Sequence, residues 1–172
     1  MAAALVFAGC SKKGNSAADS AAPDTVAAAG ANAAAATTAE TKTEPAVTVL
    51  QLSGNDQMKF SVTRLEAKAG ATVRVVLTNT GTLPKVAMGH NFVLLKKGVD
   101  PVAYSMQAAA AQATDYVPAA RSGDVIAHTR LIGPKEKAEV TFTAPTEPGE
   151  YTYLCTFPGH FAAGMKGVLV VQ

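Results

Sequence analysis

Apolar and polar side chains alternate in eight short runs after residue 45, and these runs are rich in Val, Leu, Phe, Tyr and Thr. A period of two places neighbouring side chains on opposite faces of a strand, so Val140 and Phe142 should face a core while the residues between them face water. Gly and Pro residues between the runs act as turn signals. The pattern predicts strands at residues 46–52, 59–65, 72–79, 90–95, 125–132, 138–143, 150–155 and 166–171.

Eight short strands are typical of an all-β protein built as a β-sandwich. The segment from Pro101 to Gln112 is different, because the stretch 106–112 is rich in Ala. Alanine has the highest helix propensity, so we expect one short helix over 106–112, on the outside of the sandwich.

The first 45 residues have a different composition from the rest of the chain. They are mostly Ala, Ser, Thr, Gly and Asn, with almost no bulky apolar residue after Phe7. Such a stretch buries too little surface to offset its ordering entropy, which predicts a flexible linker. The remaining residues, 46–172, have the usual size of one independently folding domain.

The segment Leu5–Cys10 resembles the end of a lipoprotein signal, in which an apolar run and two small residues precede a cysteine that is lipidated. We therefore expect residues 1–9 to be the end of a signal, Cys10 to carry a lipid, and residues 10–45 to form the tether. This predicts a periplasmic protein, or one held at the extracytoplasmic face of a membrane. The alternative is that Cys10 is an unmodified thiol.

Charge gives little information about partners. Residues 46–172 contain twelve Lys and Arg against nine Asp and Glu, and residues 1–45 contain three against four. The basic residues are scattered between acidic ones and form no cluster with aromatic residues, so we expect no nucleic-acid partner.

Three kinds of metal-binding side chain meet in the run from Cys155 to Met165, which holds a thiol, the imidazole of His160 and a thioether. A further imidazole, that of His90, lies far upstream. Soft sulfur favours Cu(I) and imidazole suits both copper oxidation states, so two His and one Cys with a weak Met describe a blue-copper centre. A structural zinc site would use more Cys or His. Taken alone, Cys155 could equally be a buried structural thiol and His90 a polar residue at a strand end.

The segments around these residues resemble the cupredoxins, in particular the azurin and auracyanin branch. The resemblance covers about residues 46–172 and implies a Greek-key sandwich with a single copper ion as cofactor. It is carried by Leu83–Lys85, Met88–Asn91, Val125–Thr129, Cys155–His160 and Met165–Gly167.

By this resemblance, His90, Cys155 and His160 are the strong equatorial copper ligands, and Met165 is the weak axial ligand. The carbonyl oxygen of Gly89 is a further candidate for a weak contact. The resemblance also implies that Asn91 and Thr156 join the two ligand segments by hydrogen bonds and hold the thiolate still.

Two features depart from the azurin pattern. Four residues separate His160 from Met165, where azurins usually have three. The chain has only two cysteines, Cys10 and Cys155, so no disulfide can form within the domain.

The function that we expect is one-electron transfer between redox proteins, such as a cytochrome and a terminal acceptor. These partners should dock transiently at an exposed edge of His160 framed by Met88, Phe161 and Ala162. The alternative is copper delivery or storage. We expect no enzyme activity, because a thiol nucleophile at Cys155 would lack an oxyanion site, and three His in the chain cannot supply additional copper sites.

Overall fold

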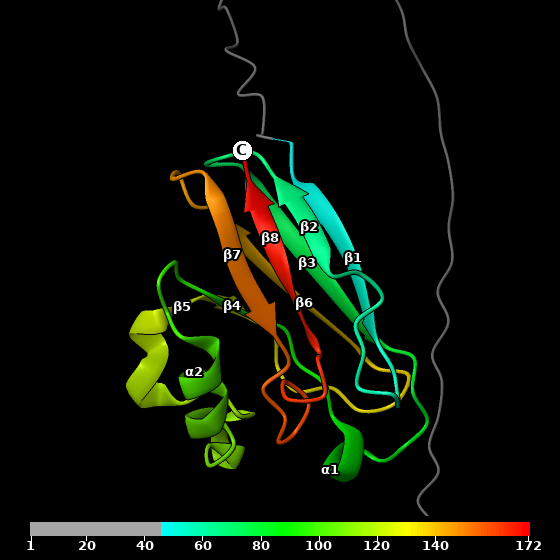
Figure 1. Cartoon of the computed structure of the whole chain (residues 1–172). Helices are drawn as coiled ribbons and strands as arrows, with labels where there is room; N and C mark the ends of the chain where they lie inside the picture. The colour runs from blue at the N-terminus through cyan, green and yellow to red at the C-terminus, as the bar shows by residue number, and fades with distance from the viewer. Residues whose placement is uncertain (1–45) are drawn as a thin grey trace, which may run out of the picture. The chain divides into compact units, whose positions relative to one another are not determined.

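The computed structural model of the chain describes residues 46–172, which form two stacked β-sheets with short helices outside them (Figure 1). The prediction of an all-β sandwich is confirmed. The three-stranded sheet has the order β1–β3–β6, and the five-stranded sheet has the order β2–β8–β7–β4–β5. The strands are β1 (Thr48–Gly54), β2 (Arg64–Ala67), β3 (Thr72–Asn79), β4 (Val93–Leu95), β5 (Val125–His128), β6 (Lys137–Thr143), β7 (Gly149–Leu154) and β8 (Lys166–Val171).

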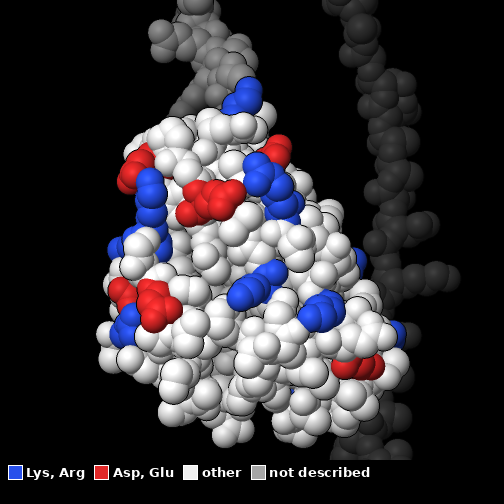
Figure 2. All heavy atoms as spheres, viewed as in Figure 1, with Lys and Arg blue, Asp and Glu red and all other residues white. Residues whose placement is uncertain are grey.

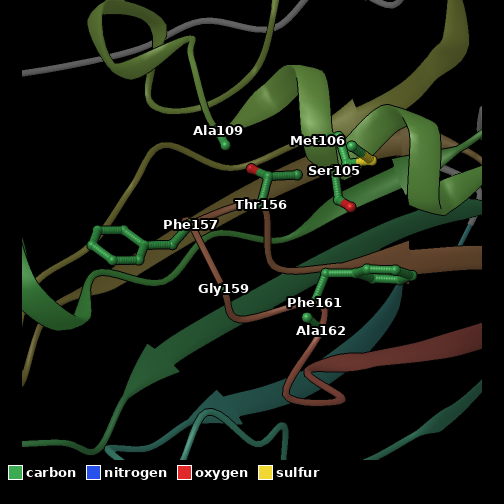
Figure 3. A pocket seen from close by; sticks show the side chains of 8 residues that line it. All are labelled: Ser105, Met106, Ala109, Thr156, Phe157, Gly159, Phe161 and Ala162. Atoms are coloured by element: carbon green, nitrogen blue, oxygen red, sulfur yellow. The ribbon is translucent and has the colours of Figure 1, made fainter.

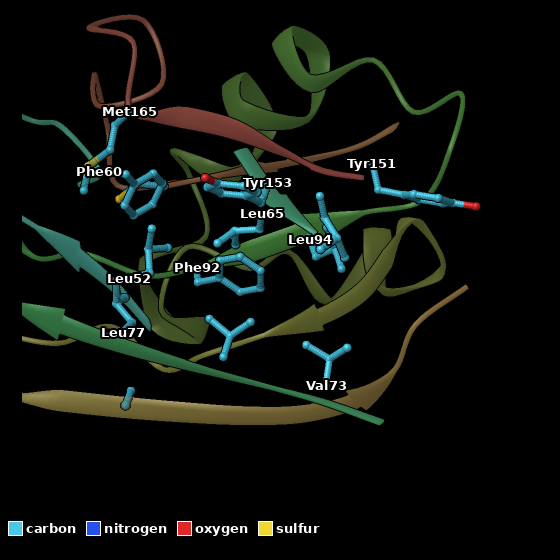
Figure 4. Packing of buried hydrophobic residues seen from close by; sticks show 14 of the residues in the cluster. Leu52, Phe60, Leu65, Val73, Leu77, Phe92, Leu94, Tyr151, Tyr153 and Met165 are labelled. Carbon is cyan, nitrogen blue, oxygen red and sulfur yellow. The ribbon is translucent and has the colours of Figure 1, made fainter. Parts of the chain in front are cut away.

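The main core lies between the two sheets, where the inward faces of the strands meet. Leu77 of β3 and Leu169 of β8 are among its fully buried members. On β6, Val140 and Phe142 pack against this core while Glu139 is exposed, as the alternation predicts. Figure 4 shows this packing, with Met165 at one end of the cluster.

A second core cluster lies outside the sandwich, between the five-stranded sheet and helix α2 (Pro101–Ala108). Val93 and Leu95 of β4 pack here with Tyr104 and Ala108 of the helix, whereas Leu94 faces the main core. The strand β4 is therefore buried on both faces, because α2 covers the side that would otherwise meet water.

Helix α2 begins and ends earlier than the predicted 106–112. The side chain of Asp100 accepts the N–H of Val102 at 2.9 Å, and Pro101 occupies the first turn, where its missing N–H has no cost. Further helical turns accompany it. These are α1 (Lys85–Met88) and 3₁₀ helices at Gln112–Thr114 and Ala119–Asp124.

Three predicted strands are longer than the observed ones, in each case because the chain leaves the sheet. In the segment 59–65, Phe60 forms only an isolated bridge with Gly54, and the continuous strand begins at Arg64. The segment 90–95 becomes β4, and 125–132 becomes β5. Between their ends, His90 and Ile132 form an isolated bridge.

The assignments of residues 1–9, residues 10–45 and the lipid anchor Cys10 lie outside the described residues. Within 46–172, none of the helices has the length and apolar character needed to cross a membrane.

Candidate metal centre

His90, Cys155 and His160 bring their donor atoms together, all within 4.8 Å of one another. The Cys155 Sγ lies 3.4 Å from Nδ1 of His160 and 4.0 Å from Nδ1 of His90, and the two Nδ1 atoms are 3.3 Å apart. All three residues are buried. One thiol and two imidazole nitrogens therefore face a common point that solvent does not reach.

Two chain segments deliver these donors to the same end of the sandwich. Figure 1 shows helix α1 and the loop between β7 and β8 at the end opposite the C-terminus. His90 follows α1 and is fixed by reciprocal backbone hydrogen bonds with Ile132, of 3.0 and 2.8 Å. Cys155 directly follows β7, and His160 lies in the ligand loop, residues 155–165, where its N–H donates to the carbonyl of Phe157.

The orientation of His90 is set by a backbone carbonyl. Its Nε2 lies 3.1 Å from the carbonyl oxygen of Asn55, which can only accept a hydrogen bond. Nε2 must therefore carry the proton, and Nδ1 presents its lone pair to Cys155 and His160. Such a partner on the outer nitrogen is the usual way in which a protein fixes a ligand histidine.

Burial shifts the titration of all three donors. It lowers the pKa of His160 to about 4, with a smaller contribution from His90, and it lowers the pKa of His90 against the opposing effect of the Asn55 carbonyl. Burial raises the pKa of the Cys155 thiol to about 12, although backbone N–H groups act against this. At neutral pH the imidazoles are thus neutral and ready to bind a metal, whereas the thiol must lose its proton as a metal binds.

Met165 is buried beside this cluster and is held by its backbone. Its N–H donates to the carbonyl of His160 at 3.0 Å, and its carbonyl accepts the N–H of Cys155 at 3.1 Å. A Cβ added to Gly54 would lie 2.7 Å from Cε of Met165 and 2.8 Å from Cδ2 of His90. The thioether and the His90 ring therefore approach each other over the backbone of Gly54, where only glycine leaves enough room.

Asn91 and Thr156 join the two ligand segments, as the resemblance implies. Nδ2 of Asn91 donates to Oγ1 of Thr156 at 2.7 Å, and Oδ1 of Asn91 accepts the N–H of Thr156 at 2.9 Å. Nδ2 also donates to the carbonyl of Asp115 at 2.8 Å. The residues next to His90 and Cys155 are thereby locked to each other by a buried amide.

Gly89 is enclosed by its neighbours. A Cβ on this residue would lie 2.8 Å from the carbonyl oxygen of Lys85 and 2.9 Å from Cδ2 of Leu131. The contact of its carbonyl oxygen with a metal stays a prediction.

Sequence reasoning missed several residues that support the centre, namely Gly54, Asn55 and Asn79. The buried amide of Asn79 accepts the N–H of Gly81 at 2.8 Å, and its Nδ2 lies 3.5 Å from the carbonyl oxygens of Met88 and Ile132 on either side of the His90 bridge. No local sequence pattern identifies these residues, because each contacts the centre through a residue more than eight positions away. The only local feature here is the Asn55–Asp56 pair, whose residue types favour a turn.

The expected exposed edge of His160 is not present, since this residue is only 2% exposed. Phe157 covers it, with ring centroids 4.6 Å apart, and Tyr116 packs on Phe157 at 5.1 Å. Aromatic side chains therefore separate His160 from the solvent.

The surface around the ligand loop is apolar. Phe157, Phe161 and Ala162 form one wall of a surface pocket, and Ser105 and Met106 of α2 belong to its other side (Figure 3). Met88 is half-buried and lies at the end of α1, two residues before His90. In Figure 2, charged residues lie mainly over the upper and middle part of the face shown, and its lower end is mostly uncharged.

The donor set fits copper better than zinc. A thiol that binds as thiolate, two neutral imidazoles and a nearby thioether are the soft and borderline donors of a blue-copper site. A structural zinc site would need a fourth strong Cys or His, and the group of metal-binding side chains found in residues 46–172 contains only His90, Cys155 and His160.

Comparisons with known proteins agree with this chemistry. Residues 46–172 match the family described as copper binding proteins, plastocyanin/azurin family. Azurin from Pseudomonas denitrificans is 41% identical over 128 residues, which cover 72% of this chain and 97% of that protein. Auracyanin-B from Chloroflexus aurantiacus is 39% identical over 129 residues, covering 74% of this chain but only 53% of the relative.

Solved structures give the same result. Auracyanin A, described as a "blue" copper protein from Chloroflexus aurantiacus, superimposes with a TM-score of 0.66 at 33% identity. The match covers 74% of this chain and all of the other.

Proposed function

The chain belongs to the plastocyanin/azurin family of copper-binding proteins, and from this premise we propose that it carries single electrons between redox proteins outside the cytoplasm. The observation that carries the proposal is the buried group of one thiol and two neutral imidazoles in His90, Cys155 and His160. We propose these three residues as the strong copper ligands and Met165 as the weak axial one. A bound copper ion supplies the chemistry, by alternating between Cu(II) and Cu(I).

The protein's part is to hold the donors in one arrangement. Electron transfer is fastest when the ligands barely move between the two oxidation states. The Asn55 carbonyl fixes the His90 ring, and the Asn91 amide joins the two ligand segments. Backbone hydrogen bonds tie Met165 to His160 and Cys155. These restraints support a rigid site.

Burial of the donors and an aromatic cover keep water away from the site. Cys155, Met165 and His90 are fully buried, and Phe157 packs over His160. A low-dielectric site disfavours the more highly charged state of an ion, so this burial favours Cu(I) and raises the reduction potential. Pro158 adds to this effect, because it has no N–H to donate toward the thiolate.

Partner proteins would dock on the apolar end of the molecule, near His160, Met88 and Phe161. Val86 is 86% exposed and Met106 is 72% exposed, so large apolar side chains already lie on the surface at this end. We propose a cytochrome or a terminal acceptor as the partner, bound briefly through Phe157 and its apolar neighbours. A small, mostly apolar contact suits a carrier that must dissociate quickly.

We also propose that a lipid on Cys10 anchors the protein to a membrane, with residues 10–45 as the tether. Replacing Cys10 by Ser should move the protein from the membrane fraction to the soluble fraction of the producing cells. Equal membrane association of the variant would contradict the anchor.

Redox titration of the copper-loaded protein, followed by its visible spectrum, tests the proposed function. The oxidised protein should show an intense thiolate-to-copper absorption that disappears and returns in a reversible one-electron step. Cys155→Ser is the matched control and should lack this absorption, because a hydroxyl replaces the thiol. Transfer of Cu(I) to a copper-free acceptor without reversible electron exchange would instead support copper delivery. No catalytic turnover is proposed.

Replacement of Met165 by Ala tests the axial role. The variant should keep copper and the intense absorption, because the three strong donors remain. Its reduction potential should rise, since removing a donor destabilises the more highly charged Cu(II) more than Cu(I). Loss of all copper binding would contradict a weak axial role.

A further inference from the structure

Lys59 connects two parts of the metal centre that are far apart in the sequence. Its ammonium group donates a hydrogen bond to the carbonyl of Ala163, which lies in the ligand loop 104 residues away. The same Nζ would lie 2.9 Å from a Cβ on Gly164, so the ammonium sits directly over the turn that leads into Met165. Lys59 itself is exposed, so this contact lies at the surface of the loop.

The backbone of Lys59 belongs to the turn that orients His90. Oδ1 of Asn55 accepts the N–H groups of Gln57 at 3.1 Å and of Lys59 at 3.2 Å. The carbonyl of Asn55 also receives the N–H of Met58 at 3.0 Å, in addition to Nε2 of His90. The turn 55–59 is therefore closed on itself, and it holds both Lys59 and His90.

The ligand loop between His160 and Met165 is a series of tight turns. The N–H of Ala163 donates to the carbonyl of Gly159, that of Gly164 to Phe161 and that of Met165 to His160, with distances of 2.9 to 3.0 Å. Gly164 has φ +94°, a conformation that glycine adopts readily. These bonds are all local, and the ends of the loop are already held by Asn91 and by the paired strands β7 and β8. Among the described hydrogen bonds, the one from Lys59 joins residues 161–164 to a distant part of the chain.

We propose that Lys59 is a positioning residue that ties the His160–Met165 segment to the turn holding His90. Through this tie, the side of the centre that carries Met165 and the side that carries His90 move together. The significance for copper rests on the proposed function, but the tie itself is a property of the copper-free fold. Four residues separate His160 from Met165, one more than azurins usually have. The hydrogen bond from Lys59 restrains this longer segment.

Amide hydrogen exchange of the copper-free protein tests the tie without any metal. In Lys59→Met the apolar stem remains while the donor is lost, and the amides of Ala163, Gly164 and Met165 should exchange about fivefold faster or more. Amides of the central strand β3 should be unchanged. The matched control is Lys135→Met, because Nζ of Lys135 also donates to a backbone carbonyl, that of Thr80 at 3.1 Å, outside the ligand loop.

Unchanged exchange in Lys59→Met would overturn the proposal. So would equal acceleration at these three amides in both variants, because the effect would then be a general loss of stability. These outcomes are independent of the thiolate-to-copper absorption, so failure of the tie and failure of the electron-carrier function are distinguishable.

The reduction potential of the copper-loaded protein separates positioning from charge. Loss of the Lys59 charge alone should lower the potential at low salt, and this effect should fade at about 1 M salt, where the screening length is about 3 Å. Displacement of Met165 weakens a donor to Cu(II), so at high salt the potential of Lys59→Met should lie above that of the wild type, with Lys135→Met equal to the wild type. A high-salt potential of Lys59→Met equal to that of the wild type would overturn the positioning role.

Discussion

At the residue scale, Gly54 is the position where the packing around the donors is tightest. Replacing Gly54 by Ala would place a methyl group 2.7 Å from Cε of Met165 and 2.8 Å from Cδ2 of His90, well inside van der Waals contact. We expect the free energy of unfolding to fall by about 1 to 3 kcal/mol, as in other overpacked cores, and copper affinity to fall with it. Urea unfolding of the copper-free protein and metal titration measure the two effects.

Gly123→Ala is the matched control for this substitution. No atom lies within 4 Å of a Cβ added to Gly123, so the same chemical change meets open space. Its free energy of unfolding should stay within about 0.5 kcal/mol of the wild type. A Gly54 variant that behaves like the Gly123 variant would show that the site can yield to an added methyl group.

The depressed histidine pKa values predict how the stability of the copper-free protein depends on pH. His160 has a folded-state pKa of about 4, and the pKa of His90 is also lowered, chiefly by burial. Below about pH 6.5 the unfolded chain binds protons that the folded state refuses, so stability is lost as the pH falls from about 6.5 towards 4. The slope should approach about 1.4 kcal/mol per pH unit for each histidine.

Urea unfolding of the copper-free protein between about pH 7 and pH 5 measures this slope. The lowered pKa of Asp56 acts at lower pH and does not enter this window. His160→Gln removes one of the two groups, so its slope should be smaller than that of the wild type. An equal slope in the variant would assign the pH dependence to other groups.

At the element scale, the strands that lie wholly within a sheet could be predicted from alternation, and those that leave it could not. The predicted bounds of β3 (Thr72–Asn79) and β8 (Lys166–Val171) match the structure, because each run pairs with neighbouring strands along its whole length. The strand predicted at 90–95 fails before Val93. There, the side chains of His90 and Asn91 make polar contacts, with the carbonyl of Asn55 and the hydroxyl of Thr156.

The candidate site was predictable to the extent that its residues lie in short motifs. Cys155 and His160 lie five residues apart, and their chemistry identifies them. Asn55 and Lys59 act through a backbone carbonyl and a long side chain across more than thirty residues, which no local pattern encodes. The prediction of an exposed edge on His160 was wrong, because Phe157 stacks on this ring once the loop has turned.

The link between the two ligand segments predicts a large effect at Asn91. Asn91→Ala removes two buried hydrogen bonds and one part-buried one, and leaves the N–H of Thr156 without its acceptor. We expect the free energy of unfolding to fall by about 2 to 4 kcal/mol, since a buried unpaired donor keeps its full desolvation cost. Thermal or urea unfolding of the copper-free protein measures the loss.

Thr156→Ser tests whether the hydroxyl network, rather than packing, is responsible. The variant retains both the Oγ acceptor and the backbone N–H, so it should lose less than about 1 kcal/mol. If both variants lost the same amount, the Asn91 amide would not be the link between the segments.

At the scale of the whole molecule, all the described parts of the metal centre lie in residues 46–172. The main core cluster, the second cluster under α2 and the side chains of the donor group all lie in this range. The turn 55–59 and the ligand loop meet at one end of the sandwich, so the site forms only when both sheets are assembled. Folding and metal-site assembly should therefore be one cooperative event.

The location of the core and the donors predicts that a fragment of residues 46–172 behaves like the full chain. Its free energy of unfolding should agree within about 0.5 kcal/mol, and after copper loading its visible absorption should be the same, because no described contact of the core or the donors needs residues 1–45. Urea unfolding followed by circular dichroism and by the copper absorption should give coincident transitions in both proteins. A fragment that unfolds at lower urea, or that loses the absorption before its secondary structure, would show that residues 1–45 or a separately melting loop contribute to the site.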